Sequence, residues 1–239
     1  INLSGDAVVG ELNLAAGIKA EVSGLTDGAK VSVLANGVFT KKLENPASYL
    51  KYFEAVDETK DIRATSDALE IAMGAEQIAK YNTVYDAAVK MSADGVFASG
   101  GAVEAECPYC EKTVTWEPLE AIDGSTNKEL SGDKHYYLSG NIDNSAIYLV
   151  YGKSCLHLNG YNITSTTRAI YVEQKYHLNI MGDGAVVGTA NKHSSLGWWG
   201  ALDVPGSVNL FGGIYSSFNN GPAIAVRGSD AASVVNMYN

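Results

Sequence analysis

Apolar and polar residues alternate with a period of two in a short pattern that recurs along residues 146–239. Such alternation places side chains in turn on the two faces of a β-strand, and turns rich in Gly, Asn and Ser separate the strands. Each copy holds a first strand that opens with Ala and a second strand that ends near Gly. The first strands are expected at 146–149, 169–172, 201–204 and 223–226, and the second strands at 156–160, 178–182, 208–212 and 235–238.

The spacing of these copies predicts a solenoid. The opening alanines lie 23, 32 and 22 residues apart, and periods of about 20–50 residues are typical of repeat architectures. Because one such unit cannot bury its own apolar face, stacked units share one continuous core. The pattern therefore predicts an all-β solenoid, a right-handed parallel β-helix, with a loop at 191–200 that projects from one coil. Asn side chains in the second strands are expected to stack as a hydrogen-bonded ladder.

The same pattern returns near the start of the chain. Residues 1–40 repeat the apolar-Asn-apolar strand at Asn2 and Asn13, and they are expected to be the end of a β-helix portion. Residues 107–239 are expected to start another β-helix portion. Between them, residues 41–106 are predicted to form a small α/β closing segment.

This closing segment is predicted to contain one amphipathic helix. Within residues 75–91, Ile78, Tyr81 and Tyr85 follow spacings of three and four, which place their side chains on one face of a helix. We expect this helix to pack beside the solenoid. Smaller elements are expected at 47–53, as a short helix, and at 62–64 and 68–72, as a hairpin.

Composition narrows the classes of partner and compartment. The 239-residue chain has 17 basic and 27 acidic residues and a formal charge of −10, which argues against nucleic acid, because phosphate binding needs clustered Lys and Arg. No apolar run approaches the ~18 residues of a membrane span. Twenty-five Gly and 14 Tyr with only 18% charged residues favour a secreted, extracellular or cell-surface protein rich in β-structure.

Several motifs resemble the large repetitive secreted proteins of anaerobic gut bacteria. Residues 107–116 read C-P-x-C-x-K-T-V-x-W, residues 132–140 read G-x-x-H-Y-Y-L-S-G, and residues 155–164 read C-L-x-L-N-G-Y-x-I-T. Residues 24–33, G-L-T-x-G-A-x-V-x-V, and 49–53, Y-x-x-Y-F, are similar to the segments that close a module in those proteins. The resemblance implies pectate-lyase-like right-handed parallel β-helix repeats and a secreted location, and it implies no particular activity.

The closing segment precedes the opening segment in this chain. The ends of a parallel β-helix expose unpaired strand edges and are normally capped, and no capping pattern is visible near either terminus. We therefore expect one repeat of a longer array, or a subunit that stacks on other copies of itself end to end. Head-to-tail contacts of this kind form open fibres when the rotation does not close. The alternative is a chain cut from a larger protein.

The three cysteines are the first candidates for chemistry. Cys107 and Cys110 have C-x-x-C spacing. With His135 and Cys155 they could form a tetrahedral zinc site, because thiolate and imidazole suit zinc. A disulfide between Cys107 and Cys110, or three free thiols, are the alternatives, since a small buried thiol at Cys155 is also ordinary core packing.

Acids and bases for polysaccharide chemistry form a second group. A lyase needs carboxylates for Ca²⁺ and a base, and a hydrolase needs paired carboxylates. No two of the acids occupy matching positions in adjacent coils, so we predict that the chain is not an enzyme. The candidate acids are Asp143, Glu173, Asp183, Asp203 and Asp230, and the candidate bases are Arg168 and Arg227.

Aromatic residues of the projecting loop are the best candidates for ligand binding. Trp198 and Trp199, with His193 and with Tyr215 near in the pattern, could stack on a sugar ring of a cell-surface or host glycan, or on a partner protein. The alternative is that one Trp folds back over the edge of the coil. Two further histidines, His157 and His177, fall one coil apart and are expected to point outward in a ladder, without a role.

Three functions follow in order of preference. The first is a structural repeat or subunit of a secreted, cell-surface or filament-forming β-helix protein, assembling head to tail and adhesive in some settings. The second is a carbohydrate-binding module that uses the tryptophan loop. The third is a polysaccharide lyase or hydrolase, and fold alone does not confer that activity.

Overall fold

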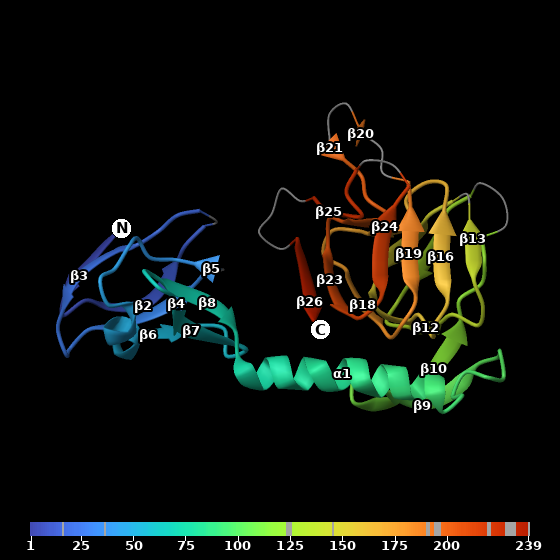
Figure 1. The fold of residues 1–239 in the computed structure, drawn as a ribbon, viewed down its shortest axis with the longest axis horizontal. Helices are drawn as coiled ribbons and strands as arrows, with labels where there is room; N and C mark the ends of the chain where they lie inside the picture. Colours follow the sequence, from blue (N-terminus) through green and yellow to red (C-terminus); the bar gives the residue numbers. More distant parts are fainter. Residues whose placement is uncertain are drawn as a thin grey trace. The chain divides into compact units, whose positions relative to one another are not determined.

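The computed structural model describes residues 1–239 except 16, 36, 123–125, 145, 190–191, 194–196, 219–220, 228–232 and 239, and it omits the side chains of 192, 193, 197 and 198. The protein is mostly β-structure with parallel sheets, as Figure 1 shows. The chain divides into two compact units, an N-terminal unit of Ile1–Ala79 and a C-terminal unit of Lys80–Asn239. Each unit is described by itself.

Three parallel sheets build the C-terminal unit. Sheet I contains β12 (His135–Tyr137), β15 (Lys153–His157), β18 (His177–Met181), β23 (Ser207–Phe211) and β26 (Val234–Tyr238). Sheet II contains β13 (Ile142–Asn144), β16 (Asn162–Ser165), β19 (Ala185–Gly188) and β24 (Ile214–Ser217). Sheet III contains β11 (Lys128–Ser131), β14 (Tyr148–Tyr151), β17 (Ile170–Val172), β22 (Leu202–Val204) and β25 (Ile224–Val226).

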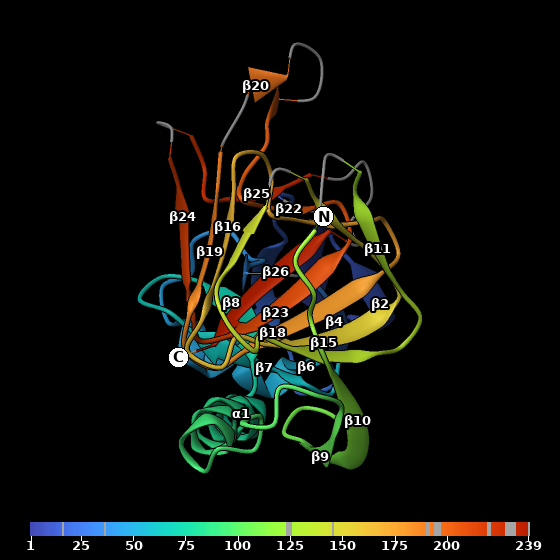
Figure 2. The same cartoon turned by 90° about the vertical axis from the view of Figure 1, so that its right-hand side faces the viewer.

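The chain passes through these sheets in a fixed order. Each passage takes one strand from sheet I, one from sheet II and one from sheet III before the chain returns to the next position in sheet I. Figure 2 shows β15, β18, β23 and β26 side by side as a result. We call one such passage a coil.

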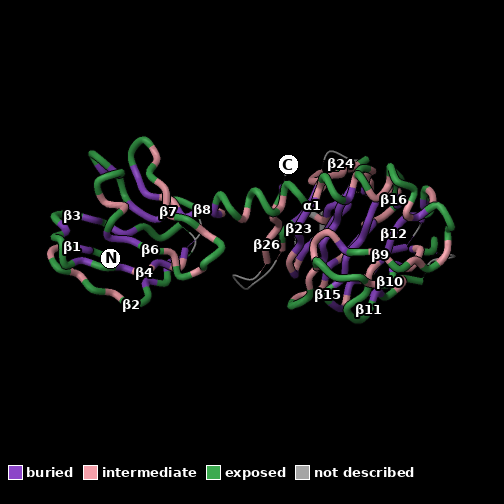
Figure 3. The backbone as a smooth tube through the Cα atoms, turned by 90° about the horizontal axis from the view of Figure 1, so that it is seen from below, coloured by how far each residue is buried: buried purple, intermediate pink, exposed green. Residues whose placement is uncertain are grey.

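The register of sheet I separates an inner face from an outer face. Leu156, Ile180 and Leu210 are opposite one another in successive strands and belong to the core. Because side chains alternate along a strand, the residues on either side of this column point outward. Figure 3 shows the buried segments following the strands through the interior of the unit.

A hairpin closes one end of sheet I. Strands β9 (Val103–Cys107) and β10 (Lys112–Pro118) pair antiparallel, and β10 then pairs parallel with β12. A second small hairpin, β20 (Lys192–His193) with β21 (Gly197–Trp198), lies between β19 and β22 and outside the three sheets. This second hairpin confirms that the long interval loops out of a coil.

The predicted long helix is present as α1 (Ala75–Ala93). From Lys80 onward the helix belongs to the C-terminal unit, where Val84 and Ala88 are buried. The imidazole Nε2–H of His157 donates to the carbonyl oxygen of Ala88 over 2.9 Å, and the ring of Tyr81 lies 4.1 Å from that of Tyr238. These contacts hold the helix against the outer face of sheet I, as expected of a docking helix.

Shorter strands and one 3-10 helix build the N-terminal unit. Its apolar centre includes Val31, Val33, Phe39 and Leu69. The predicted hairpin and short helix are both present, the helix as a 3-10 turn. The elements are β1 (Asn2–Gly5) with β3 (Glu21–Leu25), β2 (Val8–Asn13) with β4 (Lys30–Leu34) and β6 (Phe53–Ala55), β5 (Gly37–Val38) with β8 (Leu69–Met73) and β7 (Lys60–Ala64), and η1 (Pro46–Tyr52).

The units divide after Ala79, whereas the sequence predicts boundaries after residues 40 and 106. The physical reason is the packing of the middle segment. Tyr52, Phe53 and Leu69 share one core with Leu3, so residues 41–79 fold with the N-terminal strands. Residues 80–106 instead join the C-terminal unit, through the helix and β9.

Candidate metal centre

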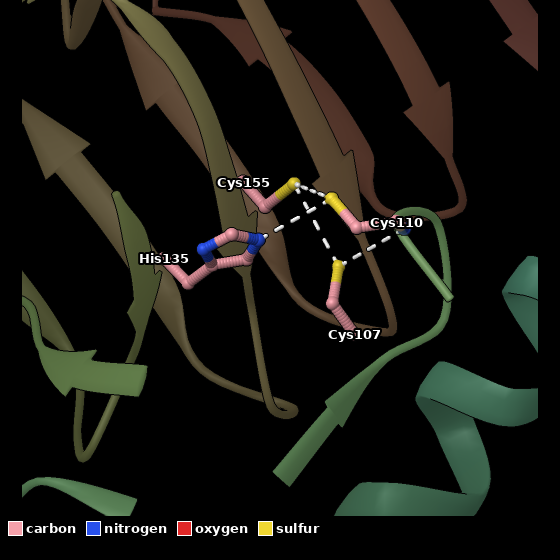
Figure 4. A group of neighbouring side chains, drawn as sticks. All are labelled: Cys107, Cys110, His135 and Cys155. Carbon is pink, nitrogen blue, oxygen red and sulfur yellow. Dashed lines mark hydrogen bonds between the residues drawn. The ribbon is translucent and has the colours of Figure 1, made fainter. Parts of the chain in front are cut away.

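Four side chains from two parts of the C-terminal unit converge on one point. Cys107 ends β9 and Cys110 follows it in the hairpin turn, while His135 lies in β12 and Cys155 in β15. Their sulfur and nitrogen atoms all lie within 4.8 Å of one another. Figure 4 shows the three sulfurs and the imidazole directed toward a common centre.

The hairpin turn orients two of the thiols. The backbone N–H of Cys110 donates to the Cys107 sulfur over 3.4 Å, and the N–H of Glu111 donates to the Cys107 carbonyl over 2.8 Å. Glu111 has φ of 54°, in the left-handed region that few non-Gly residues adopt. This tight turn brings Cys107 and Cys110 to the same side of the hairpin.

Sheet I supplies the other two side chains through its register. His135 and Cys155 are opposite each other in adjacent parallel strands. Trp116 precedes them and Asn179 follows them in the same outward column. Parallel strands lie about 4.8 Å apart, so a shared register alone places the imidazole beside the Cys155 thiol.

Three distances within the cluster match those expected between tetrahedral zinc ligands. With zinc–sulfur bonds of about 2.3 Å and zinc–nitrogen bonds of about 2.05 Å, tetrahedral angles require sulfurs about 3.8 Å apart and sulfur–nitrogen pairs about 3.6 Å apart. The Cys155 sulfur lies 3.8 Å from the sulfurs of both Cys107 and Cys110. The Cys110 sulfur lies 3.4 Å from Nε2 of His135.

The electrostatics of the cluster favour a thiolate beside a cation. Hydrogen bonds with Cys107, Cys155 and His135 hold the pKa of Cys110 well below its ordinary value. Burial alone would lower the pKa of His135, but hydrogen bonds and charge from Cys107 and Cys110 outweigh it and raise that pKa to about 9. A metal ion would take the place of this proton, because zinc binds thiolates and neutral imidazole.

The surroundings limit access of water to the cluster. Cys107 and Cys155 are buried, and Cys110 and His135 are partly exposed. The ring of Trp116 stands edge-on to His135 with centroids 5.1 Å apart. The side-chain amide of Asn179 donates to the Cys155 sulfur over 3.6 Å, a contact of the kind that orients and tunes metal ligands.

The structure thus brings together all four predicted metal ligands. All three cysteines are free thiols, so the alternative of a Cys107–Cys110 disulfide does not describe this structure. Burial at Cys155 is not mere core packing, because its sulfur faces the other donors on the outer side of the sheet. Sequence reasoning places Asn179 in the asparagine ladder but missed its contact with the Cys155 sulfur, which depends on a register that no local motif reveals.

Of the four side chains predicted to bind a ligand, the structure describes those of Trp199 and Tyr215. The side chains of His193 and Trp198 lie outside the described residues. Trp199 is partly buried, and the guanidinium of Arg168 lies 4.4 Å from its ring centroid. Tyr215 packs against the core, and its hydroxyl donates to the carbonyl of Gly212 over 3.2 Å. Tyr215 is therefore a residue that packs on the core.

The candidate acids and bases of sheet III form an ion cluster. The fully buried carboxylate of Asp203 accepts from Arg168 Nη1 over 2.7 Å and from Arg227 Nε over 2.7 Å and Nη2 over 2.5 Å. Both guanidinium groups are thus engaged by this carboxylate. Asp143 and Asp183 are exposed and Glu173 is partly buried, while Asp230 lies outside the described residues.

The predicted histidine ladder is wrong. His157 is opposite Met181, whereas His177 is opposite Lys153 and Ser207. Both rings point outward, but the two histidines occupy different positions along their strands, because one follows and the other precedes the core leucine. His157 is fully buried beneath α1 and bonded to it.

Comparison of the chain with protein-family models, with curated proteins and with solved structures finds no match. The chemistry of the cluster is therefore judged from its donor atoms. Within the described part of the chain, no helix has the length and apolar character needed to cross a membrane.

Proposed function

We propose that this chain is a structural module, a right-handed parallel β-helix whose first coils are fastened by a zinc ion. Cys107, Cys110, His135 and Cys155 would hold the ion. The observation that carries the proposal is the convergence of four N and S donors from a hairpin turn and two adjacent strands within 4.8 Å of one another, with the Cys155–Cys107, Cys155–Cys110 and Cys110–His135 distances at the values of a zinc site.

The donor set favours zinc over other common ions. Three thiolates and one imidazole are the ligands of structural zinc sites, which are four-coordinate and tetrahedral. Calcium and magnesium require oxygen donors, and the cluster offers none among its four members. With all four positions supplied by protein, the ion has no open site for substrate, so its role is structural.

The position of the cluster explains what the ion would do. The β9–β10 hairpin covers the first edge of sheet I, and an uncovered sheet edge invites unwanted pairing. A metal bridge from Cys107 and Cys110 to strands β12 and β15 ties this cover to two coils. Because a preformed site is absent in the unfolded chain, the free energy of binding adds to the free energy of folding.

The repeated order of the strands supports the β-helix itself. Each coil contributes one strand to each sheet, and the inner columns of sheet I fill with aliphatic side chains. The resemblance of the motifs and the Gly-rich composition with few charged residues support a secreted or cell-surface setting, as one repeat or subunit of a larger assembly. Arg168, Arg227 and Asp203 bind one another, which leaves the proposal of a lyase or hydrolase without support.

Metal analysis tests the proposal. Protein purified without added chelator should contain one equivalent of zinc, measured by mass spectrometry of the released metal. His135→Gln should lose the zinc, whereas His177→Gln, on the same face of sheet I and bonded to Ser207 and Asn179, should keep it. Zinc-free wild-type protein that still fails to take up added zinc, or equal metal content in both variants, would refute the proposal. Thiol titration of the denatured protein separates the disulfide alternative, because that form would release one thiol and not three.

A further inference from the structure

We propose that strand β26 of one copy pairs in parallel with strand β1 of a second copy, so that Asn2 continues the asparagine column of sheet I. This inference rests on the proposed β-helix, and it assigns the residues of an end-to-end contact. Three independent features of the two strands support it.

The first feature is a one-way ladder of amides on the outer face of sheet I. Asn179, Asn209 and Asn236 are opposite one another in β18, β23 and β26. The amide of Asn209 donates to Asn179 Oδ1 over 2.9 Å, and the amide of Asn236 donates to Asn209 Oδ1 over 2.9 Å. An asparagine in the next strand of this sheet would donate to Asn236 in the same way.

The second feature is the likeness of β1 to β18. Residues 2–6 read Asn-Leu-Ser-Gly-Asp and residues 179–183 read Asn-Ile-Met-Gly-Asp. The glycines of both turns have positive φ, 62° at Gly5 and 81° at Gly182. Leu3 is buried in the core of its unit and Asn2 is exposed, which is the same inward and outward assignment as Ile180 and Asn179. Strand β1 therefore has the side-chain pattern that the next position of sheet I requires.

The third feature is an exposed core position in β26. Met237 follows Leu156, Ile180 and Leu210 in the inner column of sheet I, yet 66% of it is exposed, against 2% or less for those three. A further strand would cover it. In the proposed register Leu3 of the second copy lies opposite Met237, and Asn2 lies opposite Asn236.

The edges needed for this pairing are available among the described strands. Strand β26 pairs with β23 on one side only, and β1 pairs with β3 on one side only. Both existing pairings are parallel, so a parallel β26–β1 contact continues the direction of both sheets. The two surfaces differ, so the contact is head to tail, and each copy can bind one neighbour through β26 and another through β1.

Sedimentation velocity of the zinc-bound chain tests the contact. Wild-type protein should assemble as its concentration rises from about 1 µM to about 1 mM, the range in which weak contacts approach half-saturation. Met237→Lys should abolish assembly with little effect on the monomer, because the side chain is already exposed. Tyr161→Lys is the matched control, since Tyr161 is 37% exposed between β15 and β16, in a coil away from β26, and it should assemble like the wild type.

A mixture of two blocked copies gives the sharpest result. Met237→Lys leaves β1 intact, and Asn2→Arg leaves β26 intact. Each variant alone should remain monomeric, whereas their mixture should form dimers and nothing larger. Monomeric wild-type protein at every concentration, assembly of Met237→Lys, or a mixture without dimers would overturn the contact. Zinc content measured on the same samples shows whether the proposed metal-fastened fold stands when the contact fails.

Discussion

The outer faces of sheets I and III each hold a polar cluster that links successive coils. The two clusters differ in the kind of interaction that joins their side chains. In sheet III the Asp203 carboxylate is surrounded by the guanidinium groups of Arg168 and Arg227. In sheet I three sulfurs and one imidazole converge. One cluster is held together by ion pairs between side chains alone, whereas the other has the donors for an ion from solution.

An outward column of residues that face one another in adjacent strands accepts either kind of link. The requirement is only that facing residues come from adjacent strands in register. An ion cluster of protein groups is complete when the chain folds, while a metal cluster makes stability depend on metal supply and on reduced thiols. The two clusters should therefore respond to different treatments.

Removal of the metal should have the largest effect. Apparent binding free energies of structural zinc reach about 10 kcal/mol in small domains, so a chelator should lower the urea midpoint of the C-terminal unit strongly. All three tryptophans, Trp116, Trp198 and Trp199, lie in that unit, and their fluorescence reports on it alone. Chelator should leave the already metal-free His135→Gln protein unchanged. An equal response of both proteins would show that the chelator acts elsewhere.

Removal of the buried carboxylate should come second. Asp203→Ala leaves two guanidinium groups, each with 18% exposed side-chain area, without a counter-charge, and breaking a buried ion pair costs about 3–5 kcal/mol. Urea unfolding followed by tryptophan fluorescence measures this loss. Asp143→Ala, at an exposed position of β13, should change the free energy of unfolding by less than about 0.5 kcal/mol. Equal effects of the two substitutions would mean that the cluster contributes no specific link.

Lowering the pH should destabilise the protein through His157, a third polar residue on an outer face, which is buried in its neutral form and needs neither a metal ion nor a counter-charge. Burial lowers the pKa of His157 to about 4 from its ordinary 6.5, and its two ring nitrogens bond to Ala88 and Asn159. As the pH falls, the unfolded chain binds a proton on this imidazole at a higher pH than the folded chain does. The contribution of neutral His157 to stability is therefore complete above pH 6.5. It falls as pH drops toward about 4, by about 3 kcal/mol in all.

Replacement of this histidine isolates its part of the acid response. His157→Gln should be less stable at neutral pH but should lack this portion of the pH dependence between pH 6.5 and pH 4. Urea midpoints of both proteins across that range measure the difference. Parallel curves for the two proteins would contradict the assignment to His157.

The smallest effect is expected at the edge of the ion cluster. The guanidinium of Arg168 lies over the rings of Trp199 and Tyr171, 4.4 and 5.0 Å from their centroids. Trp199→Ala should cost about 1 kcal/mol, the scale of a partly buried cation–π contact. Trp199→Phe should recover part of that loss, and an unchanged free energy of unfolding for both would remove Trp199 from the cluster.

The hydrophobic pattern along the chain predicts the helices and strands better than it predicts which of them pack together. The helix over residues 75–91 and the strands around Asn179 and Asn209 follow directly from periodicity. The metal ligands were found because C-x-x-C marks two of them, and the chemistry of the remaining His and Cys suggested the others. The division after Ala79 was missed because a continuous helix runs across it, without any change of pattern.

The local sequence does not reveal the register of the sheets, that is, which residues of adjacent strands lie opposite each other. The sequence suggests Arg168, Asp203 and Arg227 as separate catalytic groups, whereas in the structure both guanidinium groups pair with the one carboxylate. Which residues face each other depends on how many residues each turn holds, and those numbers vary from coil to coil. His157 and His177 differ for the same reason: they lie four register positions apart, at opposite ends of the paired strands, and one ring is beneath the helix while the other is beside Ser207.

The β20–β21 hairpin shows how freely this architecture takes on new material. Ala146 and Ala169 are 23 residues apart and Ala169 and Ala201 are 32 apart, yet Ile170 remains opposite Leu202. The extra residues leave at a corner and return without disturbing the strands on either side. That corner is a natural grafting point, where evolution or an engineer can display a foreign peptide on an unchanged scaffold.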